Sequence, residues 1–530
     1  MQITKIPFSD IPQFSQKDKD YALEADYLRP FFKYGVKIES FPNIIQAKEK
    51  KFTNRTALVQ ALEIQYKGIE TSASVKDNIA ALQHKNTFTI TTAHQPSLFT
   101  GPLYYIYKII SVIHLSRELN KKYKNYHFVP TFVSGAEDHD FEEINHAAIF
   151  GKTYQWQQQQ QGATGTMSIE GLSPVLEALL EVLGEGEYAM ELKSILNTAY
   201  RGTHNYGKAA FLLANALFQK YGLVVLDMNT PILKKEFIPY MIDELKNGVS
   251  KSIVPKTQKA LEENGFAKQT HVRDINLFYL YNQQRNRIEK KGEFYHVLNT
   301  DLTFSESDMM ELVETHPERF SPNVVMRPIY QELILPNLAY IGGGGEIAYW
   351  LERKEQFEYW DLPFPMLIRR NSVLWISKAD AKKMDKLKLS IKDLFAPTDS
   401  LIKKHVLAKA DNTLELNREK EEITAIYQTI KDKALKIDQG LGQLILAEQS
   451  KQLKAISNLE ARLHKAEKQK HEVAINQISK LKEKLFPKNG LQERHDNFIP
   501  FYLKYGSAYF DLLLEQLDPL QKGFIIIKEA

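Results

Sequence analysis

The chain has 530 residues, of which 43% are hydrophobic and 25% charged, the composition of an ordinary globular protein. This length exceeds what one hydrophobic core usually organises, so we expect two or three folding units. The net charge of +4, from 69 basic and 65 acidic residues, is too small to predict a nucleic-acid or anionic-membrane partner. The absence of cysteine excludes disulfides, thiolate metal sites and cysteine nucleophiles.

The start of the chain and its hydrophobic runs predict a cytoplasmic protein. The first residues, MQITKIPFSD, lack the basic and apolar regions of a secretory signal peptide. The most apolar stretch, AAFLLANALF at residues 209–218, is too short to span a bilayer and is typical of a buried helix face. We therefore expect no membrane and no nucleic acid among its partners.

Residues 87–134 predict a strand, a helix and a second strand. The β-branched run TFTITT at 87–92 favours a strand. After Gly101, apolar residues at three- and four-residue spacing favour a helix that reaches Leu119. HFVPTFVS at 127–134 favours the next strand. Such a βαβ unit implies a parallel sheet with a right-handed crossover.

The same alternation of helices and strands continues to about residue 380. It includes expected helices at 207–222, 323–335 and 346–360 and expected strands ending at Asp227 and at 337–343 and 365–370. These elements predict an α/β fold with a doubly wound parallel sheet.

We place this sheet in a core at residues 70–398, after a mostly helical N-terminal segment at 1–69. Two insertions interrupt the core. The first, near 150–200, is mostly helical and contains a glutamine run typical of a solvated loop. The second, near 255–320, contains short strands around 271–298 that predict a small β-meander.

From about residue 399 the composition changes to Lys, Glu, Gln, Leu and Ile. Apolar residues form one stripe from Ile423 to Ile437 and another from Leu453 onwards, in three- and four-residue steps. This spacing is typical of a coiled coil. With a reversal near Gly440 and a stop at Pro487, it predicts an antiparallel helical hairpin at 399–486. A C-terminal segment at 487–530 is expected to pack back on the core.

Polar side chains directly follow two of the predicted strands. His94 and Gln95 come after the first strand, and the run EDHD at 137–140 comes after the second. In an open α/β sheet, ligands sit outside the carboxyl ends of the strands, so these side chains should share one rim. A lone histidine there is typical of a structural cap, whereas a polar cluster beside it favours a functional site.

The cluster suits several kinds of chemistry. Asp138, His139 and Asp140 fit acid–base roles, in which a carboxylate orients the histidine or accepts a proton from an attacking amine. His94 can donate to an oxygen that gains charge in a transition state. Metal binding is the weaker alternative, because adjacent residues rarely ligate one ion together.

The stretch AYIGGGGEIAYW at 339–350 places four glycines between a strand and a helix. Such a turn lets a ligand approach the backbone N–H groups at the start of the helix. It is not the dinucleotide fingerprint, because Ile347 occupies the third glycine position. Glu346 is expected either to cap the helix or to bind a substrate amine.

These stretches together resemble the cysteine-adding enzymes of bacillithiol biosynthesis, the BshC family. The resemblance rests on AHQPSLFTGPLYYIYKIIS, GAEDHDFEEINH, YGLVVLD, SPNVVMRPIYQELILPNLAYIGGGGEIAYWLE and FPKNGLQERHDN, which follow in this order over nearly the whole chain. It implies a Rossmann-like core with inserted segments and a coiled coil that mediates dimerisation.

The resemblance also implies a reaction, the last step of bacillithiol biosynthesis. L-Cysteine is ligated through its carboxyl group to the amine of glucosaminyl-malate. Because amide formation from a free carboxylate is uphill in water, an adenine nucleotide (ATP or ADP) is the expected cofactor, and the need for a metal stays open.

The substrate-binding residues that the resemblance implies lie in the quoted motifs: Gln95, Tyr104, Lys108, Asn145, Arg327, Gly343, Gly344, Glu346 and Tyr349. A guanidinium at Arg327 and backbone N–H groups of the turn at 342–345 suit the two carboxylates of malate. The competing interpretation places Arg327 on a helix surface, paired with Glu332.

We predict a second pocket for the nucleotide around residues 491–507, beside 374–380 at the other end of the hairpin. Its expected residues include cations for phosphate, a ring for adenine and polar groups for hydrogen bonds: Trp375, Ser377, Gln492, Arg494, Asn497, Lys504, Tyr505 and Gly506. In the alternative interpretation, Arg494 and Asn497 merely fix the C-terminal helix to the coil.

Two other functions stay open at this point. One is an unrelated sugar- or nucleotide-modifying enzyme that binds a metal through the acidic loop. The other is a non-enzymatic coiled-coil scaffold, which does not account for polar turns clustered on one rim of the sheet.

Overall fold

The computed structural model describes residues 1–408 and 415–529, so residues 409–414 of the predicted coiled coil lie outside the described residues. The chain divides into two compact units. The larger unit comprises residues 3–374 and 492–526, and the smaller one comprises residues 375–491 with both chain ends. The division falls within the strands of a small sheet of order β1 (Gln2–Ile6), β15 (Phe524–Lys528), β14 (Ser372–Ile376).

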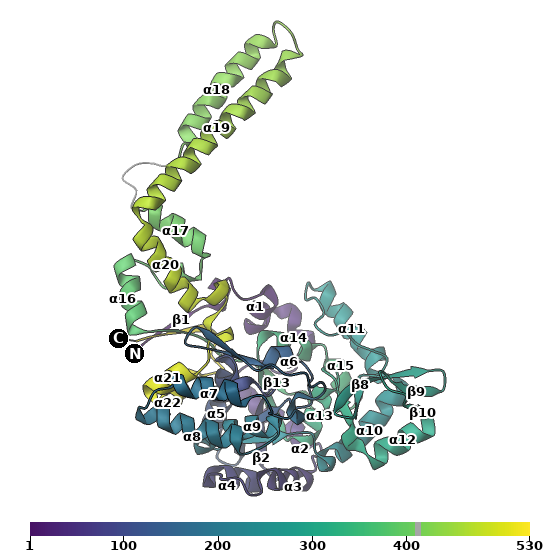
Figure 1. Ribbon diagram of the computed structural model, residues 1–530. Coiled ribbons are helices and arrows are strands. Elements are labelled where there is room, and N and C mark those ends of the chain that lie inside the picture. The colour runs from purple at the N-terminus through teal and green to yellow at the C-terminus, as the bar shows by residue number, and fades with distance from the viewer. Residues whose placement is uncertain (409–414, 530) are drawn as a thin grey trace. The chain divides into compact units, whose positions relative to one another are not determined.

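A five-stranded parallel sheet forms the centre of the larger unit (Figure 1). Its strands are β2 (Thr87–His94), β3 (His127–Ser134), β6 (Val224–Asp227), β12 (Asn337–Gly342) and β13 (Met366–Arg369). They lie in the order β13-β12-β2-β3-β6, and every neighbouring pair is parallel. When the five strands are numbered one to five along the chain, their order from β6 to β13 is 3-2-1-4-5. This is the order of a doubly wound, Rossmann-like sheet, which confirms the predicted fold class.

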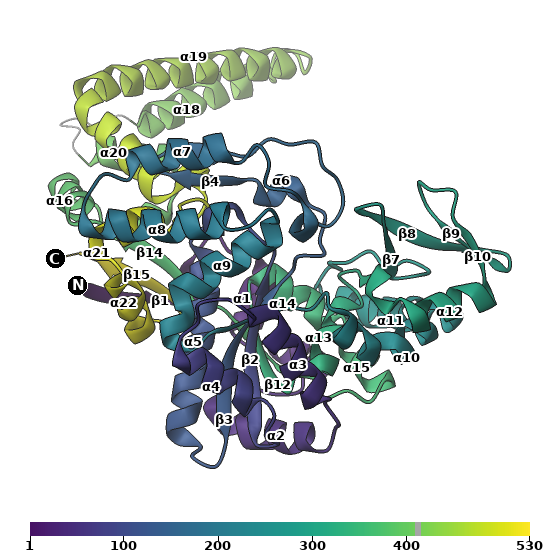
Figure 2. The ribbon, with the colours of Figure 1, turned by 60° about the horizontal axis from the view of Figure 1, so that its bottom comes forward.

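Helices cover the sheet, and their apolar faces make the core. α5 (Tyr104–Lys122) packs on β2 and β3, and α2 (Phe41–Glu49) packs on β12 (Figure 2). Phe88, Leu115 and Ile341, from β2, α5 and β12, belong to one buried cluster. All residues of β2 before His94 are buried, as expected for a strand covered on both faces.

The remaining N-terminal and C-terminal helices of the larger unit are short. They are α1 (Gln16–Ala22), α3 (Arg55–Tyr66) and α4 (Ala73–Ala81) before the sheet, and α21 (Ile499–Tyr505) and α22 (Ala508–Gln516) after residue 491.

The first insertion lies between β3 and β6. It contains α6 (Phe141–Ile144), the hairpin β4 (His146–Ile149) and β5 (Lys152–Gln155), α7 (Ser173–Val182) and α8 (Glu187–Arg201), and α9 (Tyr206–Phe218) leads back to β6.

The second insertion lies between β6 and β12 and contains a five-stranded antiparallel sheet. The sheet has the order β10 (Thr303–Ser305), β9 (Phe294–Val297), β8 (Gln284–Lys291), β7 (Leu277–Tyr281), β11 (Phe320–Pro322). It is larger than the meander expected at 271–298, because β10 and β11 extend it. The helices of this insertion are α10 (Pro231–Asn247), α11 (Val249–Glu263) and α12 (Glu306–Thr315).

Two expected helices differ from the structure near β12. The helix expected at 323–335 is α13 (Arg327–Ile334), because the Asn323 carboxamide accepts from the backbone N–H groups of Val325 and Met326 and forms a turn first. The helix expected at 346–360 is broken into α14 (Gly344–Leu351) and α15 (Lys354–Tyr359).

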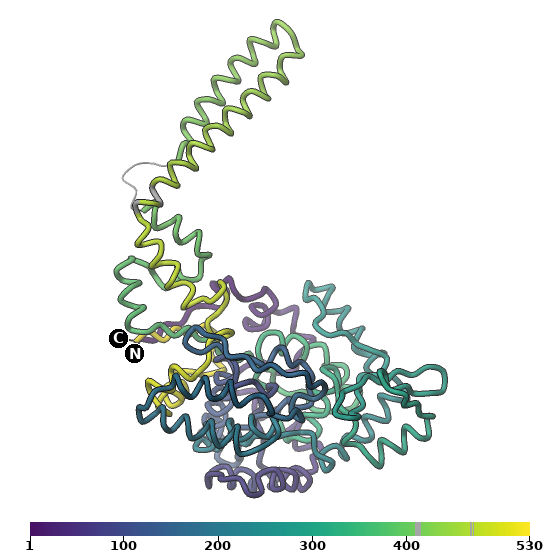
Figure 3. Tube along the Cα trace, in the orientation of Figure 1, coloured from purple at the N-terminus to yellow at the C-terminus, as the bar shows by residue number. Residues whose placement is uncertain are grey.

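The smaller unit contains the helical hairpin. α16 (Lys378–Leu387) and α17 (Thr398–Leu407) precede α18 (Asn417–Ala434), and α19 (Leu441–Lys470) and α20 (Glu472–Leu485) follow. α18 and α19 pack side by side in opposite directions (Figure 3). A 2.6 Å ion pair between Lys420 and Glu460 joins them. No helix among the described residues is both long enough and apolar enough to cross a membrane.

Candidate functional site at the end of the central sheet

A pocket of about 720 Å³ opens in the larger unit, where four of the parallel strands end. His94 at the end of β2, Ser134 at the end of β3, Asp227 at the end of β6 and Gly343 directly after β12 all line it. The strand order reverses between β2 and β12, and open α/β sheets bind ligands at this switch point. The pocket is therefore where the fold itself predicts a binding site.

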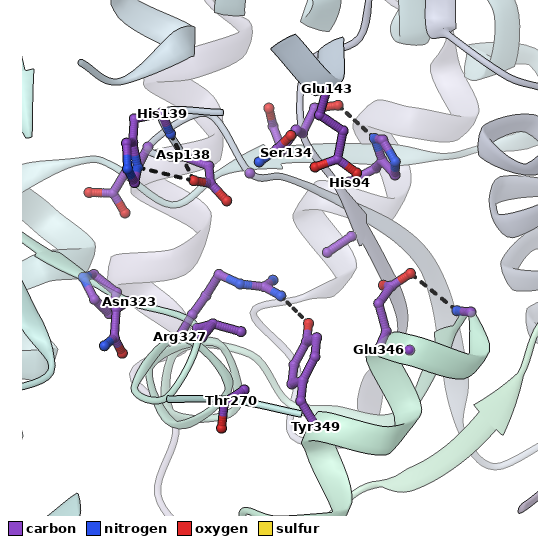
Figure 4. Close-up of a pocket in the computed structure, with 18 of the residues that line it drawn as sticks. His94, Ser134, Asp138, His139, Glu143, Thr270, Asn323, Arg327, Glu346 and Tyr349 are labelled. Atoms are coloured by element: carbon purple, nitrogen blue, oxygen red, sulfur yellow. Dashed lines mark hydrogen bonds and ion pairs between the residues drawn. The ribbon is translucent and has the colours of Figure 1, made fainter. Parts of the chain in front are cut away.

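Most residues of the predicted catalytic and substrate sites line this pocket (Figure 4). They are His94, Gln95, Tyr104, Lys108, Asp138, His139, Arg327, Gly343, Gly344, Glu346 and Tyr349. Asp140 instead caps α6 by accepting from the backbone N–H of Glu143, and it lines a neighbouring pocket. Asn145 is 2% exposed and donates to Glu142, so it stabilises the loop at 137–146 and does not line the pocket.

His94 is a neutral imidazole with a defined tautomer. Burial, and then the nearby Lys108 ammonium, lower its pKa to about 4. Nδ1 lies 2.9 Å from the Gln95 carbonyl, which only accepts, so Nδ1 carries the proton. Nε2 then accepts from the Tyr104 hydroxyl at 3.2 Å, and burial raises the pKa of Tyr104 to about 12. His94 thus presents a lone pair to Tyr104.

Asp138 and His139 contact an arginine from the inserted sheet. Arg285 Nη1 lies 3.0 Å from His139 Nδ1 and 3.7 Å from Asp138 Oδ1. Because a guanidinium only donates, Nδ1 of His139 is an acceptor and its Nε2 carries the proton. Partial burial acts to raise the pKa of Asp138, whose side chain is 46% exposed. Hydrogen bonding to His139 and the charge of Arg285 nevertheless hold this pKa well below its ordinary value.

Arg327 points into the pocket from the start of α13 (Figure 4). Its guanidinium donates to the Tyr349 hydroxyl and has no ion pair among the described residues. The alternative pairing with Glu332 is wrong, because Glu332 is buried and has other partners. Its carboxylate accepts from Asn337 at 2.7 Å and lies 3.9 Å from Lys48. Arg327 is therefore a cation available to an anionic ligand.

The glycine turn is organised around Glu346 and Asp18. Glu346 accepts from the backbone N–H of Gly343 at 3.1 Å and forms a 2.5 Å ion pair with Lys108, so it caps α14. An added Cβ at Gly344 would lie 2.4 Å from the Asp18 carboxyl carbon, so this glycine makes room for Asp18. A Cβ at Gly345 would meet no atom within 4 Å, which makes Gly345 the open part of the turn.

The sequence interpretation missed two groups of lining residues. Glu143 comes from α6, and burial, followed by repulsion from Asp140 and Asp138, raises its pKa. Arg273, Arg285 and Arg287 come from the second insertion. Because side chains alternate along a strand, Arg285 and Arg287 lie on the same face of β8. The sequence does not show that this face lines the pocket at the end of the central sheet.

The part of the pocket that the second insertion lines is positively charged, whereas the carboxylates lie elsewhere in the pocket. Of the described lining residues, those at 269–324 include three arginines and no carboxylate. All the lining carboxylates come from outside that segment: Glu137, Asp138, Glu143, Asp227 and Glu346. A 2.6 Å ion pair between Glu137 and the buried Lys234 of α10 ties the acidic loop to the second insertion.

The predicted nucleotide residues do not gather into one pocket. Arg494 lines the switch-point pocket. Asn497 is buried and donates to the carbonyls of Phe99 and Gly101, so its amide has a structural role, but it joins the C-terminal segment to the loop after β2 and not to the coil. The Lys504 ammonium lies over the ring of Tyr505, Gln492 is buried, and Gly506 has a positive φ and lies against Tyr188.

Trp375 and Ser377 belong to the smaller unit, where both make contacts within the chain. Trp375 donates to Glu529 at 2.9 Å, and Ser377 caps α16. Among the residues that the structure describes, no three His, Asp or Glu side chains converge as a metal site requires.

Comparisons with known proteins agree with the fold and with the motifs. A family model described as "Bacillithiol biosynthesis BshC, N-terminal Rossmann-like domain" matches residues 1–371, and the corresponding "C-terminal coiled-coil domain" matches residues 373–529. A protein of Flavobacterium johnsoniae is 42% identical over 97% of both chains. One of Christiangramia forsetii is 40% identical over 98% of both, and each is named "Putative cysteine ligase BshC".

Proposed function

Because the chain belongs to the BshC family of bacillithiol biosynthesis, we propose that it ligates L-cysteine, through its carboxyl group, to the amine of glucosaminyl-malate. The observation that carries this proposal is the switch-point pocket, where the motif residues converge around Arg327, a cation without an ion pair among the described residues. The reaction forms a C–N bond and breaks a C–O bond of the cysteine carboxyl group; overall, that oxygen leaves as water with two protons from the ammonium form of the amine.

The malate end of the acceptor fits the floor of the pocket. Arg327 has donors to spare beyond its bond to Tyr349, and its guanidinium matches a carboxylate in bidentate geometry. Gly345 leaves open space at the start of α14, where backbone N–H groups can donate to a second carboxylate. One carboxylate of malate thus pairs with the Arg327 guanidinium, and the other is bound by backbone N–H groups at the start of α14.

The acceptor amine needs a proton acceptor and a site for its positive charge. Asp138 stays ionised and attracts the ammonium form. Glu143, with its raised pKa, is the stronger carboxylate base of the two. His139 carries its proton on Nε2 and therefore donates, which suits an oxygen that gains negative charge as the amine attacks.

An adenine nucleotide, when bound, would supply the activation that the cysteine carboxylate needs. Three arginines line the pocket without an ion pair among the described residues, namely Arg273, Arg287 and Arg494, and their guanidinium groups fit phosphate oxygens. Equilibrium binding of ADP to the wild type and to Arg494→Ala tests this part. Equal affinity would place the nucleotide away from Arg494.

The direct test is incubation of the protein with glucosaminyl-malate, L-cysteine and ATP, followed by mass detection of the thiol product. Asp138→Asn and His139→Ala should each lower product formation about tenfold or more, the scale of losing a positioned acid–base group. Normal product formation by both folded variants would remove the loop from the mechanism. No product from the wild type would reject the proposed function.

A further inference from the structure

A second hollow, of about 590 Å³, adjoins the switch-point pocket. His139 and Arg285 line both pockets, so these two side chains form the shared wall. The second hollow lies between the loop after Asp140, the glutamine run of the first insertion and strand β8 of the second. None of its lining residues has a role in the ligation as proposed above, apart from those of the shared wall.

The two insertions are held tightly together at this hollow. An added Cβ at Gly162 would lie 1.7 Å from the carbonyl oxygen of Gln283, so the backbone of the glutamine loop touches the β7–β8 turn. The loop is also fixed internally, because Gln160 accepts from the backbone N–H of Ser168 at 2.8 Å and donates to its carbonyl at 2.9 Å. Gln157, Gln159 and Gln161 are exposed, as expected for a solvated loop, whereas Gln158 and Gln160 are partly buried, and the run forms one side of the hollow.

Beside the charged Asp140, Glu142 and Arg285, half of the residues that line the hollow carry carboxamides. They are Gln158, Gln159, Gln160, Gln161, Gln284, Asn286 and Asn299. A carboxamide both donates and accepts hydrogen bonds, as does an alcohol hydroxyl, whereas an anion needs donors alone. This composition fits a ligand rich in hydroxyl groups better than it fits a phosphate or a carboxylate.

One of these amides has a nitrogen without a hydrogen-bond partner among the described residues. Asn286 is 4% exposed, and its buried Nδ2 has no acceptor among the described residues. A buried polar group without a partner is destabilising, so its hydrogen bond is usually completed by the protein, by water or by a bound molecule. The unpaired amide is an observation independent of the composition of the hollow.

We infer that the second hollow is a sugar subsite that binds the hydroxyl groups of the hexosamine ring of the acceptor. The inference rests on the proposed function. In a glucosaminyl glycoside the amine sits on the carbon next to the one that carries the malate. With malate at Arg327 and the amine beside Asp138, the ring hydroxyls on the opposite side of the sugar extend past His139 and Arg285 into the hollow.

Calorimetric binding of two ligands tests the subsite without turnover. Glucosaminyl-malate carries the sugar and L-malate lacks it. A double variant, Gln284→Ala with Asn299→Ala, removes two exposed amides from the rim, and Asn286→Leu removes the buried amide at similar volume. Each should weaken the binding of glucosaminyl-malate by roughly tenfold or more and leave that of L-malate unchanged, because a lost hydroxyl partner affects the sugar alone.

Gln157→Ala is the matched control, since Gln157 is exposed, belongs to the same glutamine run and lines neither pocket. If the double variant and Asn286→Leu bind glucosaminyl-malate as tightly as Gln157→Ala does, the sugar subsite is rejected while the proposed function stands. Equal weakening of both ligands would also reject it. A wild type that binds neither ligand would reject the proposed function, and the subsite with it.

Discussion

At the scale of single residues, Arg327 gives the sharpest test of how the acceptor binds. Arg327→Lys keeps the positive charge and loses the planar fork that matches a carboxylate. We expect KM for glucosaminyl-malate to rise about tenfold or more, with kcat less affected, because the contact serves binding rather than the chemical step. Arg201→Lys, at an exposed arginine outside the pocket, should behave as the wild type. An unchanged KM in Arg327→Lys would remove Arg327 from the malate site.

His94 predicts a pH dependence of stability. Its pKa is about 4 in the folded chain and about 6.5 when unfolded, so between these values only the unfolded chain takes up the proton. Stability is therefore lost as the pH falls from 6.5 towards 4. The thermal midpoint of the wild type should fall a few degrees more than that of His94→Gln between pH 7.5 and 5. Replacing the exposed His84 by Gln should leave the wild-type dependence intact, and identical curves for all three proteins would refute the prediction.

The sequence predicts residues that follow a strand better than residues that reach the site from elsewhere. His94, Gln95, Asp138 and His139 were placed correctly at one rim, because the ends of parallel strands meet there. Arg285 was missed, because its position depends on how the inserted sheet packs, which local spacing does not encode. Asn497 shows the opposite error. It was predicted to bind the nucleotide because of its amide, but this amide donates to backbone carbonyls of the chain.

At the scale of elements, neighbouring glycines at the start of α14 should respond differently to the same substitution. Gly344→Ala places a Cβ 2.4 Å from the carboxyl carbon of Asp18, which is held by a 2.7 Å ion pair with Arg369. Displacing a buried carboxylate from its partner costs about 3 kcal/mol, so the thermal midpoint should fall by several degrees. Gly345→Ala meets no atom and adds helix propensity, so its midpoint should stay within about a degree of the wild type or rise. Equal midpoints for the two variants would contradict the role of Asp18.

The elements themselves were predictable where a period extends over many residues. β3 was predicted to the residue, and β2 and α5 were predicted to within about three residues, because a buried parallel strand and a long amphipathic helix give strong patterns. The start of α13 was missed because the Asn323 side chain accepts hydrogen bonds from backbone N–H groups and forms a turn there. Such a side-chain bond does not alter the spacing of apolar residues, so the sequence pattern does not show it. The extra strands of the second insertion are only three residues each, too short for an alternating pattern.

At the scale of the whole molecule, the helical hairpin leaves apolar side chains uncovered. Ile426 is 57% exposed, Ile430 41%, Leu459 51% and Leu463 45%, although α18 and α19 already pack on each other. Regularly spaced apolar residues that a hairpin does not cover are typical of a coiled-coil interface with another helix pair. The family resemblance implies that the partner is a second copy of this chain, so we predict a homodimer formed through the hairpin.

Replacing Leu459 and Leu463 by Asp tests this assembly without threatening the fold. Both side chains are exposed in the single chain, so the charges meet water in the monomer and are buried only in a dimer. Sedimentation equilibrium should show a dimeric wild type and a monomeric double variant, with unchanged circular dichroism. Gln452→Asp with Lys454→Asp, at exposed polar positions of the same helix, adds the same number of carboxylates and should remain dimeric. A monomeric wild type would show that the exposed stripe is not an interface between two copies of the chain. A double variant that stays dimeric would instead place the dimer contact outside Leu459 and Leu463.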